Sequence, residues 1–140
     1  MQQIRYETGR AISAQQLASV FARSGINRRV HDPVRMQRMA ASADLLVTAW
    51  DGELLVGVSR SLTDFCAMCY LADLAVDREY QKRGIGARLV EHTRAALGVD
   101  INLLLLAAPT AMPYYPKIGF ESLDCAFMIR APIPTESVHA

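Results

Sequence analysis

The chain has 140 residues, of which 51% are hydrophobic and 21% are charged, and its formal net charge is +1; this is typical of one globular domain and excludes a largely disordered chain. So small a net charge gives no support to nucleic-acid binding, and we expect no nucleic-acid partner. No apolar run approaches the roughly 18 residues of a membrane span, and no signal sequence opens the chain, so we expect a single cytoplasmic domain over residues 1–140 with no membrane partner.

Three elements are predicted in the first third of the chain. Alternation of apolar and polar residues over Ile4–Glu7 predicts a short strand. Ser13 is a suitable N-cap for a helix that continues to about Arg23, and Gly25 fits its C-terminal stop. A second helix with an apolar side is expected to begin after Pro33.

Short turns connect the strands that follow. Asp51-Gly52 lies between two apolar runs, 45–50 and 54–62, and this is a strong local signal for a hairpin. A third strand is predicted over Phe65–Val76. Neighbouring strands joined by short turns predict an antiparallel meander.

The second half of the chain alternates helices and strands. A helix over Gly84–Leu97 leads to an apolar run, Asn102–Ala107, which has the pattern of a central strand buried on both faces and joined in parallel. Further along, the sequence predicts a short helix over Ala111–Lys117, a strand over Phe120–Arg130 that closes the sheet, and a loose polar tail over Ala131–Ala140. The predicted architecture is α/β (α+β), with a mostly antiparallel sheet and one parallel join.

Cys66 and Cys69 have the spacing of a metal or redox motif, but no second Cys pair or His pair completes a zinc site. Both lie in an apolar, strand-like run, where a free thiol behaves as a small hydrophobic group. We therefore expect buried structural thiols and no metal. An acyl-carrier role for either cysteine is the alternative that the sequence leaves open.

A glycine-containing loop joins the strand that ends at Val76 to the helix that follows. The first N–H groups of a helix have no partner within it and favour an anion. Gly84 and Gly86 allow a phosphate to approach the backbone closely, and Lys82 and Arg83 add positive charge. The alternative is a pair of glycines that only permits a tight turn. The loop lacks the lysine–serine/threonine ending of a nucleoside-triphosphate loop and the third glycine of a dinucleotide fingerprint, so both are excluded.

Two segments resemble motifs of the GNAT family of N-acetyltransferases. Gln81–Ala87, after Leu74–Val76, is similar to the family's acetyl-CoA signature, Gln/Arg-x-x-Gly-x-Gly/Ala, which follows a strand. Ala111–Phe120 resembles the family's Ala-x-x-x-Tyr-x-Lys-x-Gly-Phe segment. The resemblance implies a GNAT-like mixed sheet of six to seven strands, flanked by about four helices and splayed between its two central strands. One position departs from the family pattern, since Ala108 stands where many members carry an asparagine.

The same resemblance implies a site for acetyl-CoA as cosubstrate. Its pyrophosphate would lie on the backbone amides of the loop and of the first helical turn. Its pantetheine arm would pair like an extra strand with the strand before the loop. The implied cofactor-binding residues are Leu74, Ala75, Val76, Gln81, Lys82, Arg83, Gly84, Ile85, Gly86, Ala87 and Tyr115.

Tyr115 is the first of two candidate catalytic residues. It matches the family's tyrosine near the cofactor sulfur, and its phenol, protonated at neutral pH, would give a proton to the departing thiolate. The alternatives are a tyrosine packed at the edge of the core, or the same role taken by Tyr114.

Asp73 is the second candidate, as the base that accepts a proton from the amine, because it lies on the strand that leads to the loop. The alternative is a structural carboxylate, bonded to backbone or to an arginine such as Arg5, Arg28 or Arg29, since a buried aspartate is rarely left unpaired. His31 is a further, less favoured candidate for the base.

These features predict an enzyme that moves an acetyl group from acetyl-CoA to a primary amine of a small molecule, peptide or protein by direct attack in a ternary complex. The alternative is a catalytically silent sensor or interaction module that binds CoA or acyl-CoA. In this family the acceptor is set by segments that correspond here to Gly25–Val34 and Leu123–Phe127. For Arg28, Arg29 and Arg35 the favoured interpretation is a solvated basic face, and the alternative is an acceptor site for an acidic or carboxylate-bearing amine. The resemblance leaves homodimerisation open.

Overall fold

The structure is a computed structural model that describes residues 3–132. The chain divides into two compact units, and the boundary between them falls between Leu105 and Leu106. The described strands and α-helices belong to the first unit, and the second contains short 3₁₀ turns and an extended segment. Across the described range, no helix has the length and apolar character needed to cross a bilayer.

The first unit is built on one mixed sheet. Its strands are β1 (Arg5–Thr8), β2 (Leu45–Asp51), β3 (Leu54–Thr63), β4 (Met68–Val76) and β5 (Asn102–Leu104). Its helices are α1 (Ala14–Ser24), α2 (Pro33–Ser42) and α3 (Ile85–Leu97), and a 3₁₀ turn, η1 (Arg78–Tyr80), links β4 to α3. The order in the sheet is β1-β2-β3-β4-β5, antiparallel except for the parallel pair β4 and β5.

The mixed α/β fold, the antiparallel meander and the parallel join are therefore confirmed. The predicted number of elements is not matched, because residues 3–132 contain one sheet of five strands and three α-helices rather than six to seven strands and about four helices. The differences all lie after Leu104.

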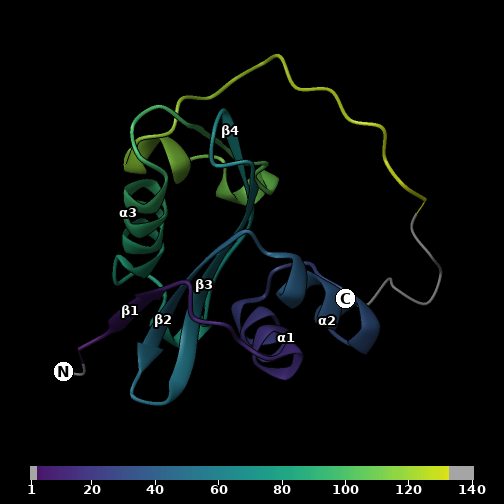
Figure 1. Ribbon diagram of the computed structural model, residues 1–140, viewed down its shortest axis with the longest axis vertical. Helices are drawn as coiled ribbons and strands as arrows, with labels where there is room; N and C mark the ends of the chain where they lie inside the picture. Colours follow the sequence, from purple (N-terminus) through teal and green to yellow (C-terminus); the bar gives the residue numbers. More distant parts are fainter. Residues whose placement is uncertain (1–2, 133–140) are drawn as a thin grey trace. The chain divides into compact units, whose positions relative to one another are not determined.

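The two faces of the sheet carry different helices. α1 and α2 cover one face, and α3 covers the other (Figure 1). Leu46 and Trp50 on β2 pack into the cluster formed with α1 and α2, whereas Val47 and Ala49 pack against α3. Successive side chains of a strand point to opposite faces, so a sheet covered on both sides reads as a continuous apolar run.

Local sequence signals fix both ends of α1, as predicted, and the start of α2. Ser13 Oγ accepts a hydrogen bond from the Gln16 N–H, and the Gln16 side chain accepts one from the Ser13 N–H, which completes a capping box. Gly25 ends α1 with a φ of 83°. Asp32 caps α2, and Pro33 occupies its first turn.

Gly57 on β3 lets α3 lie close to the sheet. A Cβ atom at this position would lie 3.1 Å from Leu89 Cδ1 and 3.3 Å from Ile85 Cγ2, both on α3. These distances are shorter than ordinary carbon–carbon contacts of about 3.5–4.0 Å. The absence of a side chain at Gly57 therefore sets the height of the first turn of α3 above the sheet.

Three predictions for the chain after α3 are wrong, and the first concerns β5. β5 ends at Leu104 and not at Ala107, and it is the edge strand of the described sheet rather than a central strand buried on both faces. The second is the helix predicted over Ala111–Lys117, where two 3₁₀ turns occur instead, η2 (Pro109–Ala111) and η3 (Tyr115–Ile118). Proline has no N–H to donate, and Pro113 and Pro116 interrupt any continuous helix here.

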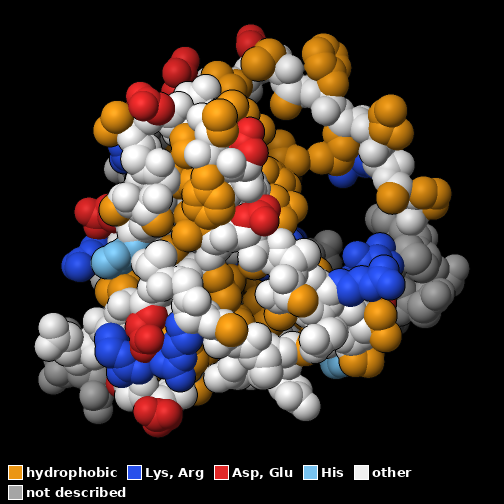
Figure 2. Space-filling model, viewed as in Figure 1, with side chains coloured by type: hydrophobic (Ala, Val, Ile, Leu, Met, Phe, Trp, Pro, Cys, Tyr) orange, Lys and Arg blue, Asp and Glu red, His pale blue; other side chains and the backbone are white. Residues whose placement is uncertain are grey.

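The third correction concerns Phe120–Arg130, which forms no strand within the described residues. From Leu123 onward its apolar side chains are exposed, with Phe127 99% and Ile129 101% accessible, and Figure 2 shows hydrophobic side chains along this extended segment. The apolar residues of the segment are compatible with a strand, but a strand also needs a partner for its backbone hydrogen bonds. The predicted tail from Ala131 onward lies outside the described residues, apart from its first two positions.

The two cysteines near the start of β4 differ in exposure. Cys69 is buried, as predicted, and burial raises the pKa of its thiol, which makes it a poor nucleophile. Cys66 is exposed, so the prediction of a buried thiol is wrong there. The reason is that β4 begins only at Met68, and Cys66 lies in a turn whose backbone N–H groups bond to the carboxylate of Asp64.

Candidate functional site

Helix α3 begins without a side-chain cap. Its N-cap is Gly84, and no side chain accepts a hydrogen bond from the first turn, whereas Ser13 and Asp32 cap α1 and α2. The first bond of the helical ladder runs from the Arg88 N–H to the Gly84 carbonyl oxygen, at 3.0 Å. The N–H groups of residues 85–87 therefore have no partner within the helix, and they lie at the positive end of its dipole.

The loop before α3 has a backbone conformation that suits an anion. Lys82 has a φ of 64°, and Gly84 has a φ of 80°. Left-handed residues that alternate with residues of negative φ turn successive N–H groups toward one side, and such concavities bind anions. A residue with a side chain pays about 1 kcal/mol or more to adopt this conformation, and such strain clusters at ligand sites. Lys82 therefore adopts a strained conformation, as Phe65 does in the turn between β3 and β4, and at Lys82 it accompanies the uncapped start of α3.

Two side chains of this loop tie it to the rest of the first unit. Gln81 Nε2 donates to the Val76 carbonyl oxygen at 2.8 Å and to the Ser24 carbonyl oxygen at 3.3 Å. Arg83 donates to the Glu79 carbonyl oxygen at 3.1 Å. Both side chains are part of the loop's own structure, so the backbone N–H groups are what the loop offers to a ligand.

Strand β4 has a free edge next to the loop. It pairs with β5 only through Met68–Tyr70, so Leu71–Val76 has no strand partner on that side within the described part of the first unit. On the opposite side, the Asp77 N–H donates to the Val56 carbonyl oxygen of β3 at 2.8 Å. Because backbone groups alternate in direction along a strand, the N–H groups of residues 74 and 76 point to the free edge.

Asp73 lies on the same strand and is almost completely buried, with a side chain that is 1% exposed. Its Oδ1 accepts a hydrogen bond from Arg28 Nε, and its Oδ2 accepts one from Arg60 Nε, each at 2.5 Å. Arg28 also donates to the carbonyl oxygen of Ala72 at 3.1 Å, where the pairing of β3 and β4 carries a bulge. This geometry favours the structural alternative for Asp73, in which Arg28 is one of the named partners.

Arg60 was not among the partners expected from the sequence. It is 7% exposed and lies in β3 between serines within a buried, largely apolar strand. Charged residues are almost never fully buried unless they are paired. An arginine inside an apolar strand is therefore the signal by which this residue could have been found.

Tyr115, the predicted acid, lies in the second unit at the start of η3. Its ring packs edge-on against the rings of Tyr114 and Phe120, with centroid distances of 5.2 Å and 5.6 Å. Burial raises the pKa of the Tyr115 phenol above its ordinary value, and burial raises the pKa of Tyr114 as well. Both phenols are therefore protonated at neutral pH and can donate a hydrogen bond.

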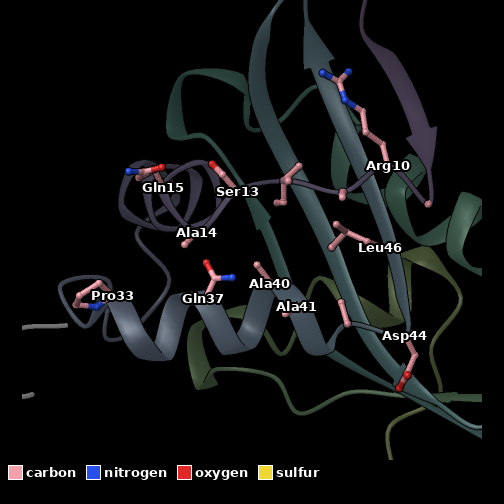
Figure 3. A pocket seen from close by; sticks show the side chains of 14 residues that line it. Arg10, Ser13, Ala14, Gln15, Pro33, Gln37, Ala40, Ala41, Asp44 and Leu46 are labelled. Carbon is pink, nitrogen blue, oxygen red and sulfur yellow. The ribbon is translucent and has the colours of Figure 1, made fainter.

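One pocket in the first unit has a volume of about 630 Å³ and lies between the start of α1, α2 and β2 (Figure 3). Its charged side chains already have partners. Arg10 donates to Glu7 at 2.8 Å, and Asp44 accepts a hydrogen bond from the Thr63 N–H at 2.9 Å. We assign no chemistry to this pocket.

The second pocket, of about 410 Å³, adjoins Asp73 and is called the basic pocket below. It is lined by Asn27, Arg28, Arg29, Arg35, Met39, Arg60, Leu62, Tyr70, Ala72 and Asp73. Arg28, Arg29 and Arg35, which were considered together as possible determinants of the acceptor, all line the basic pocket. In residues 3–132, no group of three or more His, Cys, Asp or Glu side chains could hold a metal ion.

Comparison with known proteins gives a family match over most of the chain. A family model described as an acetyltransferase (GNAT) domain matches residues 10–128. The chain is 39% identical over 70 residues to "GCN5-related N-acetyltransferase 2, chloroplastic" from Arabidopsis thaliana, which covers 49% of this chain and 27% of that protein. It is 34% identical over 70 residues to "Histone acetyltransferase TAP1" from Glycine max, with coverage of 49% and 30%. The matched region is thus about a quarter to a third of the length of these curated relatives.

Solved structures share the fold at low sequence identity. A GNAT-family acetyltransferase from Streptococcus pneumoniae TIGR4 has a TM-score of 0.74 and 21% identity, covering 93% of this chain and 98% of that one. An aminoglycoside acetyltransferase from an uncultured soil metagenomic sample, in complex with sisomicin, has a TM-score of 0.65 and 17% identity, covering 94% and 97%. At these identities the comparison establishes the fold.

Proposed function

The chain belongs to the GNAT family of acetyltransferases, and on this basis we propose that it transfers an acetyl group from acetyl-CoA to a primary amine by direct attack in a ternary complex. The observation that carries the proposal is the uncapped start of α3 beside the free edge of β4. We also propose that both units form one acetyltransferase domain, since the family match extends across their boundary.

The residues at this site fit the two parts of acetyl-CoA that the resemblance assigns to them. The N–H groups from Gln81 to Ala87 would hold the pyrophosphate, with no side chain in the way at Gly84 and Gly86. The N–H groups of residues 74 and 76 would bond the amide groups of the pantetheine arm, as a neighbouring strand does. When bound, acetyl-CoA supplies an acetyl group that is activated as a thioester.

The two candidate catalytic residues receive different roles. We propose Tyr115 as the acid that holds a proton for the departing thiolate, supported by its half-buried phenol, whose pKa is raised by desolvation so that it stays protonated. For Asp73 we favour a positioning role, because a carboxylate that took up a proton would leave Arg28 and Arg60 without their charged partner. The amine would then lose its proton through water.

The test of this function is acetyl-CoA binding by calorimetry together with thiol release across a panel of amines. Gly86 lies within α3 and is absent from the positive-φ residues, so Gly86→Leu is compatible with the helix and adds a bulky side chain to the cradle, the turn whose N–H groups we propose bind the pyrophosphate. We expect affinity for acetyl-CoA to fall about 100-fold or more while the thermal midpoint is retained, because leucine favours a helix over glycine. Ala95→Leu, which adds the same side chain at an exposed position of the same helix, is the control.

Unchanged affinity in Gly86→Leu would refute the cradle. The silent binding module makes a different prediction, namely that the native protein binds acetyl-CoA but releases no thiol with any amine. The alanine at position 108, where many family members have asparagine, is the feature of this chain that favours the module.

A further inference from the structure

The basic pocket carries more positive charge than its own carboxylates balance. Arg28, Arg29, Arg35 and Arg60 line it, and Asp73 is the one carboxylate among its lining residues. We propose that the basic pocket is the acceptor site and that it selects a small amine bearing an anionic group, either a carboxylate or a phosphate. This inference rests on the proposed acetyl transfer, because it names the acceptor of that reaction.

Two of the four guanidinium groups are fixed in position by Asp73. Each bonds one carboxylate oxygen through Nε, and each also donates to a backbone carbonyl: Arg28 to Asn27 at 2.8 Å and Arg60 to Met39 at 3.3 Å. A planar guanidinium held in this way presents its remaining N–H groups in a fixed direction, which favours the forked recognition of carboxylate or phosphate. The pocket is therefore ordered before any ligand arrives.

Arg29 supplies a charge that nothing in the described part of the first unit neutralises. It is half-buried, and its guanidinium makes no ion pair or hydrogen bond there. Arg35, by contrast, is exposed and lies 3.7 Å from Asp32, which offsets one positive charge at the rim. An anion entering the pocket would relieve repulsion among the arginines, and Arg29 is the group free to pair with it.

A solvated basic face is the competing account, and burial argues against it. The side chain of Arg60 is 8% exposed and that of Arg28 is 30% exposed, values that do not fit residues placed on a surface for solubility. In Figure 2 a group of Lys and Arg side chains lies beside α2, the helix that carries Arg35. Arg35 is the exposed arginine among the lining residues, so it lies at the rim of a pocket in which Arg28 is half-buried and Arg60 is buried.

The pocket lies where an acceptor would have to bind. Tyr70, Ala72 and Asp73 line it from β4, and the first residue proposed to bond the pantetheine arm, Leu74, is the next residue of the same strand. Its volume of about 410 Å³ is that of a small-molecule site. Met39, Leu62 and Tyr70 add apolar surface for the carbon skeleton of the amine.

The test compares matched pairs of amines that differ in the anionic group: glycine with glycinamide, glutamate with glutamine, and O-phosphoethanolamine with ethanolamine. Binding is measured by calorimetry in the presence of CoA, and acetylation is measured by thiol release from acetyl-CoA. For at least one pair, we expect the more anionic member to bind about 10–100-fold more tightly, as hydrogen bonds to a charged group provide. The first two pairs test a carboxylate and the third tests a phosphate.

Two variants test whether the preference for the anionic member of a pair depends on the basic pocket. Arg29→Gln should reduce the preference for the anionic member about 10-fold or more through KM, with affinity for acetyl-CoA unchanged. Arg38→Gln removes an arginine of α2 that does not line the pocket, and it should leave the preference intact.

The experiment distinguishes failure of the anionic-acceptor proposal from failure of the acetyl-transfer proposal. Equal binding within all pairs, binding of neither member at millimolar concentration, or an unchanged preference in Arg29→Gln would overturn the anionic acceptor, even if neutral amines are acetylated. Preferential binding of the anionic member without thiol release would support the pocket and refute acetyl transfer.

Discussion

Replacing Asp73 by asparagine separates a structural carboxylate from a catalytic base. The substitution keeps the size of the side chain and removes its charge. One oxygen remains to accept a hydrogen bond from one arginine, but the new NH₂ group turns toward the other guanidinium, where two donors face each other. Either Arg28 or Arg60 therefore loses its acceptor in a buried place.

The expected cost follows from the burial of the partners. Removing one member of a buried ion pair leaves an uncompensated charge and costs about 3–5 kcal/mol. Arg60 is 8% exposed and bears nearly the full penalty, whereas Arg28 is 30% exposed and is partly relieved by water. We expect Asp73→Asn to lower the free energy of unfolding by about 3 kcal/mol.

Urea denaturation followed by circular dichroism measures this loss without the ionic screening that guanidinium salts introduce. Asp32→Asn is the matched control: the Asp32 side chain is 45% exposed, its pair with Arg35 spans 3.7 Å, and asparagine also caps helices, so we expect a change below about 0.5 kcal/mol. A loss in Asp73→Asn below about 1 kcal/mol would refute the reasoning. If turnover then collapsed while stability held, Asp73 would be the base.

The remaining predictions concern the acid and the packing of α3. Tyr115→Phe should lower kcat about 100-fold, the usual scale for loss of a positioned acid, with little change in the thermal midpoint, and full activity would exclude Tyr115 as the acid. Because burial raises the pKa of the Tyr115 phenol, the native enzyme should keep its proton donor at pH 9 and lose it only above about pH 10; a kcat profile that falls below pH 9 with the phenol as its cause would contradict this. Gly57→Val should lower the thermal midpoint and weaken acetyl-CoA binding, because the new side chain meets Leu89 at a Cβ distance of 3.1 Å and lifts the start of α3; wild-type affinity in a folded Gly57→Val protein would show that the height of α3 does not matter.

Elements with local signals were predictable from the sequence. The capping box of α1 needs only Ser13 and Gln16, and the β2–β3 hairpin needs only the Asp51-Gly52 turn between apolar runs. The chain after Leu104 was not predictable in this way, because Phe120–Arg130 contains the apolar run of a strand and yet has no strand partner within residues 3–132. Strand formation depends on a neighbour far away in the sequence, which a local pattern cannot supply.

The candidate site also has one part that the sequence indicates and one part that only the folded structure reveals. The uncapped start of α3 follows from Gly84 and its neighbours, so sequence alone indicated an anion site there. The pairing of Asp73 with Arg28 and Arg60 joins residues 45 and 13 positions apart, and only the folded sheet brings them together. For this reason the sequence leaves both a base and a structural carboxylate open for Asp73, whereas its neighbours in the folded sheet favour a positioning role.

The bulge at Ala72 has a consequence for mutational tolerance along β4. Up to Asp73 the strand contributes side chains to the basic pocket, whereas from Leu74 onward it contributes backbone groups to its free edge. Backbone groups survive a change of side chain, so apolar strand-forming residues that keep the packing against α3 should be accepted at Leu74 and Val76, and very few residues of any kind at Asp73. A scan of all substitutions through β4 should therefore show a sharp rise in tolerance from Asp73 to Leu74. The acceptor site and the cofactor site, although they share one strand, can then diverge in sequence at different rates.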